Sequence, residues 1–115
     1  MKLGEIVQTI HIDPRKLTEY ALNPDHPRGS HKAWLFKKML GYTKTNYESL
    51  KNQIENQALS CEAIAGKADQ RGQRYSVNIA IQGMEGQNVI IRTGWMVAPN
   101  SNEAWLTTLF VRKKI

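Results

Sequence analysis

A single change of hydrophobic period restricts the fold of this 115-residue chain more than any other feature of its sequence. Before about Ser60, apolar residues recur at the helical spacing i, i+3, i+4, as in Leu17, Tyr20 and Ala21. From Arg74 onward they alternate at every second position, which is the spacing of a strand with one buried face. Helices followed by a run of strands indicate the α+β class.

Turn residues and helix stops divide the chain into elements. Asp13-Pro14 predicts a helix start and Asn23-Pro24 its end, because proline suits the first helical position and disfavours a helical residue before it. Ser30 is expected to cap a second helix that stops at Gly41. The expected elements are a short strand within 4–12, helices within 14–22, 31–40 and 45–58, and strands at 61–67, 74–82, 89–96 and 105–112.

These elements predict a single domain over residues 1–115, in which N-terminal helices pack on one face of a C-terminal antiparallel sheet of about four strands. We expect the helices to cover the face that carries Tyr75 and Val77. The opposite face, which carries Arg74 and Arg92, should be open or functional.

The charge balance indicates a polyanionic partner such as RNA. The chain has 16 Lys+Arg against 10 Asp+Glu, a formal net charge of +6, and its isoelectric point is near 9.6. Between residues 26 and 51, six cations are opposed only by Glu48. This stretch suits a track for a phosphate backbone, with Trp34, Tyr42 or Trp105 stacking on bases. A solvated helix face is the alternative interpretation.

Composition also favours a cytoplasmic protein with no membrane partner. No apolar run approaches the roughly 20 residues of a membrane span, and no apolar segment follows the charged N-terminus as it would in a signal peptide. The one cysteine, Cys61, excludes an internal disulfide, fits a reducing compartment and is expected to fill the core.

The segment from His26 to Lys32 is the first candidate site. It places two histidines, Arg28, a glycine, a hydroxyl group and Lys32 at the start of a helix, where free N–H groups and the helix dipole bind anions. The helix dipole disfavours a lysine at this end, so we expect Lys32 to bind an anion. The alternative is a lysine whose stem packs while its ammonium group stays in water.

The second candidate site is Arg92-Thr93-Gly94-Trp95 on a strand. Arg92 is expected near Arg74 on the polar face of the sheet, where two arginines would grip one phosphate. Thr93 and Trp95 share the opposite face. Cross-strand ion pairs between these arginines and glutamates are the alternative interpretation.

The pair Thr107-Thr108 on the last strand is the third candidate. We expect one hydroxyl group to reach each face of the sheet, although threonine is also an ordinary strand former. Other chemistries lack their motifs: the sequence has no P-loop, no dinucleotide-binding glycine motif, no zinc-protease motif and no cysteine pair. We therefore expect no metal and no cofactor.

Several segments together resemble a bacterial family of unknown function, numbered six-eight-eight-three. The resemblance covers about residues 12–111. Its motifs are Leu17–Pro27, Gly29, Lys32-Ala33, Phe36, Leu40-Gly41, Gly72–Tyr75, Gly83 and Gly86, and Val89–Trp95. Members resemble the tips of bacterial polymorphic toxins and the stand-alone toxins of toxin–antitoxin pairs. Their order of helices and strands is similar to the barnase–EndoU–colicin–RelE group of metal-independent ribonucleases. Because no delivery region is fused to this chain, we expect the stand-alone form.

The resemblance implies a metal-independent endoribonuclease, the toxin of a toxin–antitoxin pair, in which the ribose 2′-OH attacks the phosphate. Histidine suits proton transfer near neutral pH, and cations suit phosphate binding. The expected catalytic residues are His26, His31, Lys32, Arg92, Thr93 and Thr108. The expected RNA-binding residues are Arg28, Lys37, Lys38, Arg74, Trp95 and Thr107. The expected partners are RNA and an acidic antitoxin or immunity protein.

Two other functions use the same features. A non-catalytic module could bind nucleic acid or a partner protein through the same basic surface. A structural protein could have its edge strands paired by another chain. The sequence leaves the RNA target and the identities of the general base and acid open.

Overall fold

A five-stranded sheet forms the centre of the structure, which is a computed structural model that describes residues 1–112. The elements in chain order are η1 (Leu3–Glu5), β1 (Thr9–His11), η2 (Leu17–Ala21), α1 (Ser30–Leu40), α2 (Tyr47–Gln57), η3 (Ala58–Ser60), β2 (Ala63–Asp69), β3 (Gly72–Gln82), β4 (Asn88–Val97) and β5 (Glu103–Val111). The strand order is β1-β5-β4-β3-β2. The α+β class predicted from the hydrophobic period is confirmed.

The number of strands differs from the prediction of about four. The four expected strands form an antiparallel meander, β2 to β5. A fifth strand, β1, adds to the edge in parallel with β5, where Thr9 is opposite Glu103 and His11 is opposite Trp105. The sequence indicated a short strand in this region, but a three-residue edge strand is defined by its tertiary pairing rather than by its own apolar pattern.

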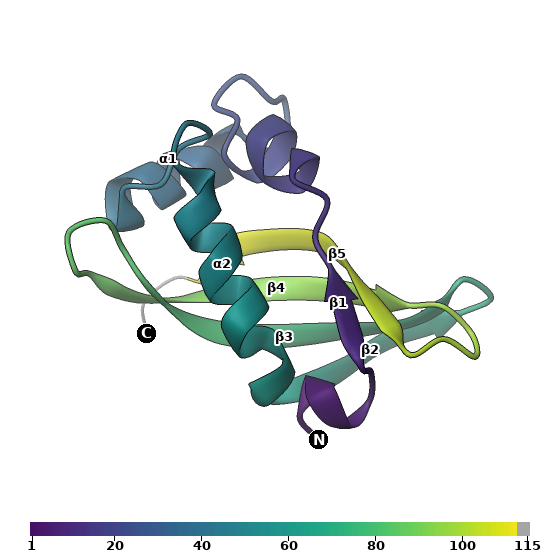
Figure 1. Ribbon diagram of the computed structural model, residues 1–115. Helices are drawn as coiled ribbons and strands as arrows, with labels where there is room; N and C mark the ends of the chain where they lie inside the picture. Colours follow the sequence, from purple (N-terminus) through teal and green to yellow (C-terminus); the bar gives the residue numbers. More distant parts are fainter. Residues whose placement is uncertain (113–115) are drawn as a thin grey trace.

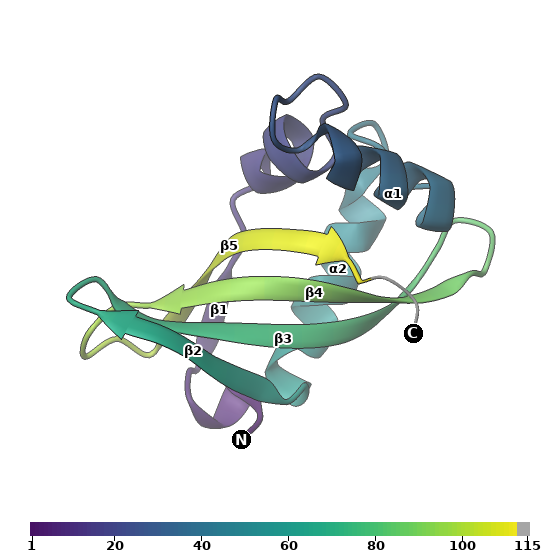
Figure 2. The same cartoon turned by 180° about the vertical axis from the view of Figure 1, so that it is seen from behind.

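The inner face of the sheet is apolar and is covered by α2. Val77, Ile79 and Ile81 of β3 are fully buried, and they share one core with Leu50 and Ile54 of α2. Figure 1 shows α2 crossing in front of the strands. Seen from behind, in Figure 2, strands β2 to β5 lie in front of α2, and α1 lies along the edge formed by β5.

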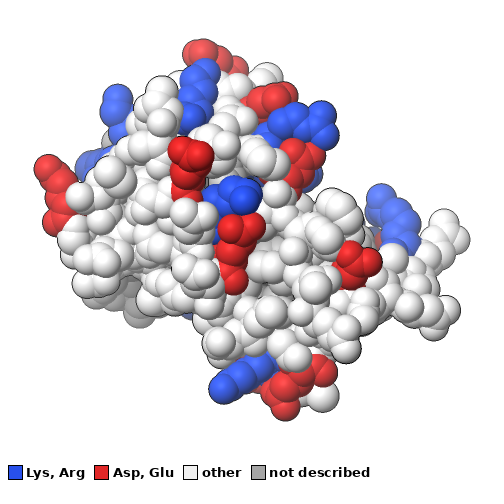
Figure 3. Space-filling view, in the orientation of Figure 1, with Lys and Arg blue, Asp and Glu red and all other residues white. Residues whose placement is uncertain are grey.

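The outer face of the sheet, which we call the open face, carries a single acidic side chain on β3, β4 and β5, that of Glu103, which is bonded to His11. Its residues include Arg74, Ser76, Asn78 and Ala80 of β3, Ile90, Arg92, Gly94 and Met96 of β4, and Glu103, Trp105, Thr107, Thr108 and Phe110 of β5. No described helix covers these strands in Figure 2. In contrast, Figure 3 shows Lys and Arg mixed with Asp and Glu on the side that bears α2.

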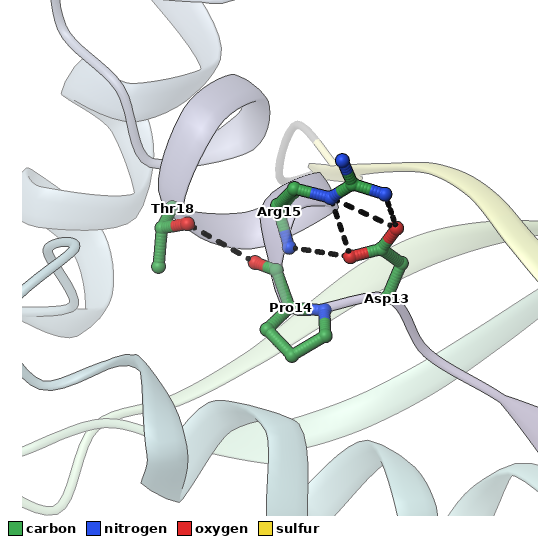
Figure 4. A network of polar contacts seen from close by, with 4 residues as sticks. All are labelled: Asp13, Pro14, Arg15 and Thr18. Carbon is green, nitrogen blue, oxygen red and sulfur yellow. Dashed lines mark hydrogen bonds and ion pairs between the residues drawn. The ribbon is translucent and has the colours of Figure 1, made fainter.

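The first helical segment begins as expected but does not continue as an α-helix. The carboxylate of Asp13 accepts a bond from the backbone N–H of Arg15 at 3.0 Å and is also held by the Arg15 guanidinium, as Figure 4 shows. The hydrogen bond from the Arg15 side chain lowers the pKa of Asp13 to about 2. Thr18 Oγ1 donates to the carbonyl of Pro14 at 3.3 Å. The chain then widens into the π-helical turn η2, a feature that often accompanies functional sites.

Two expected site residues, Thr93 and Trp95, lie in the core. Both side chains are fully buried on the inner face. Thr93 Oγ1 donates to the carbonyl of Val77 at 2.8 Å and accepts from Trp95 Nε1 at 2.8 Å. Their predicted face is therefore correct, but their predicted contact with RNA is not, because no atom of either side chain reaches the surface. They stabilise the sheet instead.

We predict that Thr93→Val lowers the free energy of unfolding by about 1–3 kcal/mol, because it leaves the buried Trp95 N–H without an acceptor. Urea denaturation monitored by circular dichroism measures the change. The control Thr107→Val, at a half-buried position of the neighbouring strand, should change the value by less than about 0.5 kcal/mol. An unaltered unfolding midpoint for Thr93→Val would contradict the assignment.

Candidate functional site

The side chain of Lys32 joins three segments at the β5 edge of the sheet. Lys32 is half-buried in the first turn of α1. Its Nζ donates to Thr108 Oγ1 on β5 at 3.0 Å and to the hydroxyl of Tyr20 on η2. The same ammonium group lies 4.5 Å from the ring centre of Tyr20 and 5.7 Å from that of Phe110. We call Tyr20, Lys32, Thr108 and Phe110 the Lys32 cluster.

The charge of Lys32 is not balanced by a carboxylate within the described part of the chain. Its two hydrogen-bond acceptors are neutral hydroxyl groups, and none of the ion pairs found among residues 1–112 includes Lys32. The expected alternative, an ammonium group left in water, does not describe this side chain. A half-buried cation among hydroxyl groups is a favourable position for an incoming anion.

Tyr20 is the cluster residue that the sequence interpretation missed, because its spacing placed it in an apolar stripe with Leu17 and Ala21. Those two neighbours are fully buried, whereas Tyr20 is half-buried. The hydrogen bond from Lys32 lowers the pKa of the Tyr20 phenol, burial opposes that shift, and the bond with Thr108 adds to it. The signal in the sequence was the phenol itself, a polar tip within an otherwise aliphatic stripe. Because its pKa is lowered, the phenol of Tyr20 loses its proton at a lower pH than that of an ordinary tyrosine.

A bulge in β5 directs Thr107 and Thr108 toward Gly94. The register of β4 and β5 shifts between Gly94 and Trp95. A Cβ atom on Gly94 would lie 2.9 Å from Thr108 Cγ2 and 3.2 Å from Thr107 Oγ1. Both threonines therefore crowd the outward side of Gly94, and the expectation of one hydroxyl group per face is wrong. Glycine is required here so that Thr108 can lean toward Lys32.

Arg92 lies beside the Lys32 cluster on the open face. Its cross-strand neighbours are Asn78 on β3 and Phe110 on β5, and its Nε donates to Asn78 Oδ1 at 3.1 Å. Phe110 thus contacts Lys32 on one side and is opposite Arg92 on the other. The expected cross-strand ion pairs do not form at Arg92 within residues 1–112. Lys32 and Arg92 therefore approach the same region of the open face.

Arg74 does not join Arg92 at one phosphate. Arg92 is opposite Asn78, whereas Arg74 lies four positions before Asn78 on β3 and is opposite Met96. At the rise of a strand this separation is about 13 Å. The predicted two-arginine grip is wrong, and Arg74 is left as a separate cation on the same face.

His26 holds the loop before α1 rather than facing the open face. Its Nδ1 accepts from the backbone N–H of Arg28 at 3.0 Å and of Gly29 at 2.9 Å. Its ring packs edge-on against Tyr20 at 5.0 Å. Gly29, not Ser30, is the N-cap residue of α1, so the predicted Ser30 cap is wrong. Since Nδ1 is occupied by two donors, His26 is a positioning residue for the loop and for Tyr20.

Of the remaining basic residues predicted for the site, His31 lies beside the Lys32 cluster, and the others are exposed on the loop before α1 or in its last turn. His31 stacks on Trp34 at 6.1 Å and lines a hollow of about 410 Å³ with Lys32 and Phe110. Arg28, Lys37 and Lys38 are exposed as well.

Lys38 lies 4.7 Å above the Trp34 ring, and both Lys37 and Lys38 are in the last turn of α1. The helix dipole favours cations at that end, so their position alone requires no RNA. On α2, Lys51 pairs with Glu55 at 3.0 Å. The predicted basic track is therefore divided between separate elements.

Solvent reaches the Lys32 cluster from two sides. The hollow beside Lys32 and Phe110 opens on one side. A second hollow of about 360 Å³ is lined by Tyr20 together with Asp13, Arg15, Lys16 and Glu19. Within residues 1–112, no group of three His, Cys, Asp or Glu side chains is arranged to hold a metal ion. In the same residues, no helix has the length and apolar character needed to cross a membrane.

The family model described as Domain of unknown function (DUF6883) matches residues 2–113. This chain belongs to that family. The resemblance noted in the sequence is thereby confirmed at the level of the family. Comparison with curated proteins and with solved structures found no match.

We predict that Lys32→Met in this DUF6883 domain raises the pKa of Tyr20, because it removes the largest cause of the lowered value. Thr108→Val should raise the pKa by a smaller amount. Ultraviolet titration of phenolate absorbance measures both, and subtraction of the Tyr20→Phe curve isolates this residue from the other tyrosines. Lys37→Met serves as the control and should leave the pKa read from the difference curve unchanged. If Lys32→Met leaves the titration curve of Tyr20 unchanged, the proposed bond between Lys32 and Tyr20 is wrong.

Proposed function

We propose that this DUF6883 domain is a metal-independent endoribonuclease whose active site is the Lys32 cluster together with Arg92. The observation that carries the proposal is the hydrogen-bonded contact of Lys32 with Tyr20 and Thr108, next to Arg92. The one acidic residue that β3, β4 and β5 place on this face, Glu103, is bonded to His11. RNA cleavage without a metal needs a base near a phosphate that cations hold. The cluster supplies groups of both kinds.

The roles follow from the positions of these groups. Tyr20, as phenolate, takes the proton of the ribose 2′-OH, whose oxygen then attacks the adjacent phosphorus. The bond to the 5′ oxygen breaks, that oxygen takes a proton, and the products are a 2′,3′-cyclic phosphate and a free 5′-OH. Lys32 and Arg92 balance the charge that develops on the phosphoryl oxygens, and Thr108 donates a hydrogen bond. His31, at the rim of the hollow beside Lys32, supplies the proton for the leaving oxygen.

The proposal extends to the biological role. We infer that the protein acts as the toxin of a toxin–antitoxin pair and that an acidic antitoxin covers the open face. The net charge of +6 supports this, because complementary charge speeds the capture of a partner. An inhibitor on the open face would block Arg92 and the Lys32 cluster together.

A second candidate function is a non-catalytic module that binds nucleic acid or protein through the same surface. The observation in its favour is that Lys32 already bonds to two side chains, as a purely structural lysine would. In that case Arg92 and Arg74 would bind phosphates, and Tyr20 would have no chemical role.

Cleavage of total RNA in excess chelator separates the two functions. We predict discrete fragments with the unmodified protein, and a loss of rate of about 10²–10⁴-fold for Tyr20→Phe, the range for removal of a general base. The rate should rise with pH as Tyr20 loses its proton, and Lys32→Met should move that rise to higher pH. Arg71→Gln, in the turn between β2 and β3 and away from the cluster, is the control.

Other results would favour the second function. Intact RNA that is retained by the protein and released by salt indicates binding without catalysis. Thermal midpoints of each variant show whether a loss of cleavage merely follows a loss of structure.

We predict that expression of the unmodified protein in a bacterial host arrests growth, and that Tyr20→Phe at the same expression level relieves the arrest. Growth curves with immunoblotting measure both. Equal toxicity of the two proteins would contradict the toxin role through this active site.

A further inference from the structure

We propose that Trp105 is a stacking platform for one nucleobase of single-stranded RNA, flanking the phosphate that the Lys32 cluster holds. Trp105 is 52% exposed, although it lies on a strand whose inward neighbours Ala104 and Leu106 are buried. The imidazole of His11 stacks against one face of its indole, with ring centres 4.3 Å apart and planes within 18°. Since His11 covers that face, the exposed area belongs to the other face and the edges of the indole.

The platform is held in place before any ligand arrives. His11 is opposite Trp105 in the parallel pairing of β1 and β5, so the two rings leave neighbouring strands side by side. His11 Nε2 is bonded to the carboxylate of Glu103, which fixes the imidazole. A fixed aromatic ring loses little conformational freedom when a base stacks on it. The parallel edge strand β1 therefore positions the indole of Trp105 on the open face, through the stacking of His11.

The surroundings of Trp105 favour a nucleic acid over an apolar protein surface. Met96 is its cross-strand neighbour, and Arg74 lies next in the same row. The next row along the open face carries Ser76 and Thr108, and the row after it carries Asn78, Arg92 and the half-buried Phe110. Ser76 and Thr108 therefore separate Trp105 from Phe110 and from the exposed Ile90 beyond it, so Trp105 is not part of one continuous apolar patch.

The distance to the Lys32 cluster suits a bound strand. Because of the bulge, Trp105 and Thr108 are opposite Met96 and Gly94, which are two positions apart on β4, about 7 Å at the rise of a strand. A short run of unstacked nucleotides spans that distance. A cationic surface with an aromatic ring is the usual arrangement for single-stranded nucleic acid, in which every base offers a face for stacking. This inference rests on the proposed function and adds the substrate class, which is unpaired rather than double-stranded RNA.

Binding of a 2′-O-methyl oligonucleotide tests the proposal, because the blocked 2′ oxygen prevents cleavage. Trp105→Leu should weaken binding about 5- to 150-fold, which corresponds to the ~1–3 kcal/mol of one stacked base. The dependence of log Kd on salt should keep its slope, since no phosphate contact is lost. Trp105→Phe should restore most of the affinity. A duplex of the same sequence should bind more weakly than the single strand to the unmodified protein.

Trp34 provides a matched control on another element. It is 53% exposed and also stacks on a histidine, but it lies on α1 away from the open face. The expected stacking of Trp34 on a base is not retained, because its indole packs with His31 and Lys38 on α1. Trp34→Leu should therefore bind like the unmodified protein. In Trp34→Phe, Trp105 is the remaining exposed indole, because Trp95 is fully buried, so the oligonucleotide should quench its fluorescence.

The outcomes separate this inference from the proposed function. Failure of the unmodified protein to bind or cleave RNA overturns both. Cleavage by the unmodified protein, with equal affinity in Trp105→Leu and no quenching, overturns only the platform. Equal losses in Trp105→Leu and Trp105→Phe with altered thermal midpoints would also overturn it, because they indicate a structural role. Binding of an acidic protein that Trp105→Leu abolishes, without any effect on RNA, assigns the face to a protein partner instead.

Discussion

The ammonium group of Lys32 holds together three segments that are far apart in the chain. It bonds to Tyr20 on η2 and to Thr108 on β5 from the first turn of α1. This position is unfavourable by itself, because the dipole of α1 repels a cation at its N-terminus and partial burial weakens hydration. An aliphatic side chain would fill the same space without that cost. The sequence retains an ionised group where stability alone would not place one, as expected of a group with a function.

The sheet supplies the other half of the site through two departures from regular structure. The bulge at Gly94 turns Thr108 toward α1, and only a residue without a Cβ leaves room for it. On the opposite side, the π-turn of η2 brings Tyr20 out of the apolar stripe to meet the same ammonium group. Because α2 covers the inner face of the sheet, the cluster and Arg92 meet on the face that the described helices leave open.

Much of the fold could be predicted from the sequence, because alternation of apolar residues fixes which side of a strand is buried. That rule correctly placed Val77 inward and Arg92 outward. It also placed Thr93 and Trp95 on one face, but it could not show that they bond to each other in the core. The meeting of Lys32 with Thr108 depends on a bulge, and a bulge has no signature in a sequence where both threonines suit a strand.

The same limit explains why the role proposed for Tyr20 emerges only from the structure, and why the sequence named Trp105 only as one of three aromatic residues that could stack on bases. Each has the apolar surface that a core residue needs, and the role proposed for it depends on which residue contacts its polar or exposed part. For Tyr20 that neighbour is twelve residues away on another helix, and for Trp105 it is His11 on a parallel edge strand. Along β5, Thr108, which bonds to Lys32, follows Trp105 on the open face, and Phe110 opposite Arg92 follows Thr108. On the proposed function, a single strand of RNA running along β5 would meet the stacking surface first and the charged cluster next, so that one edge of the sheet would serve both recognition and chemistry.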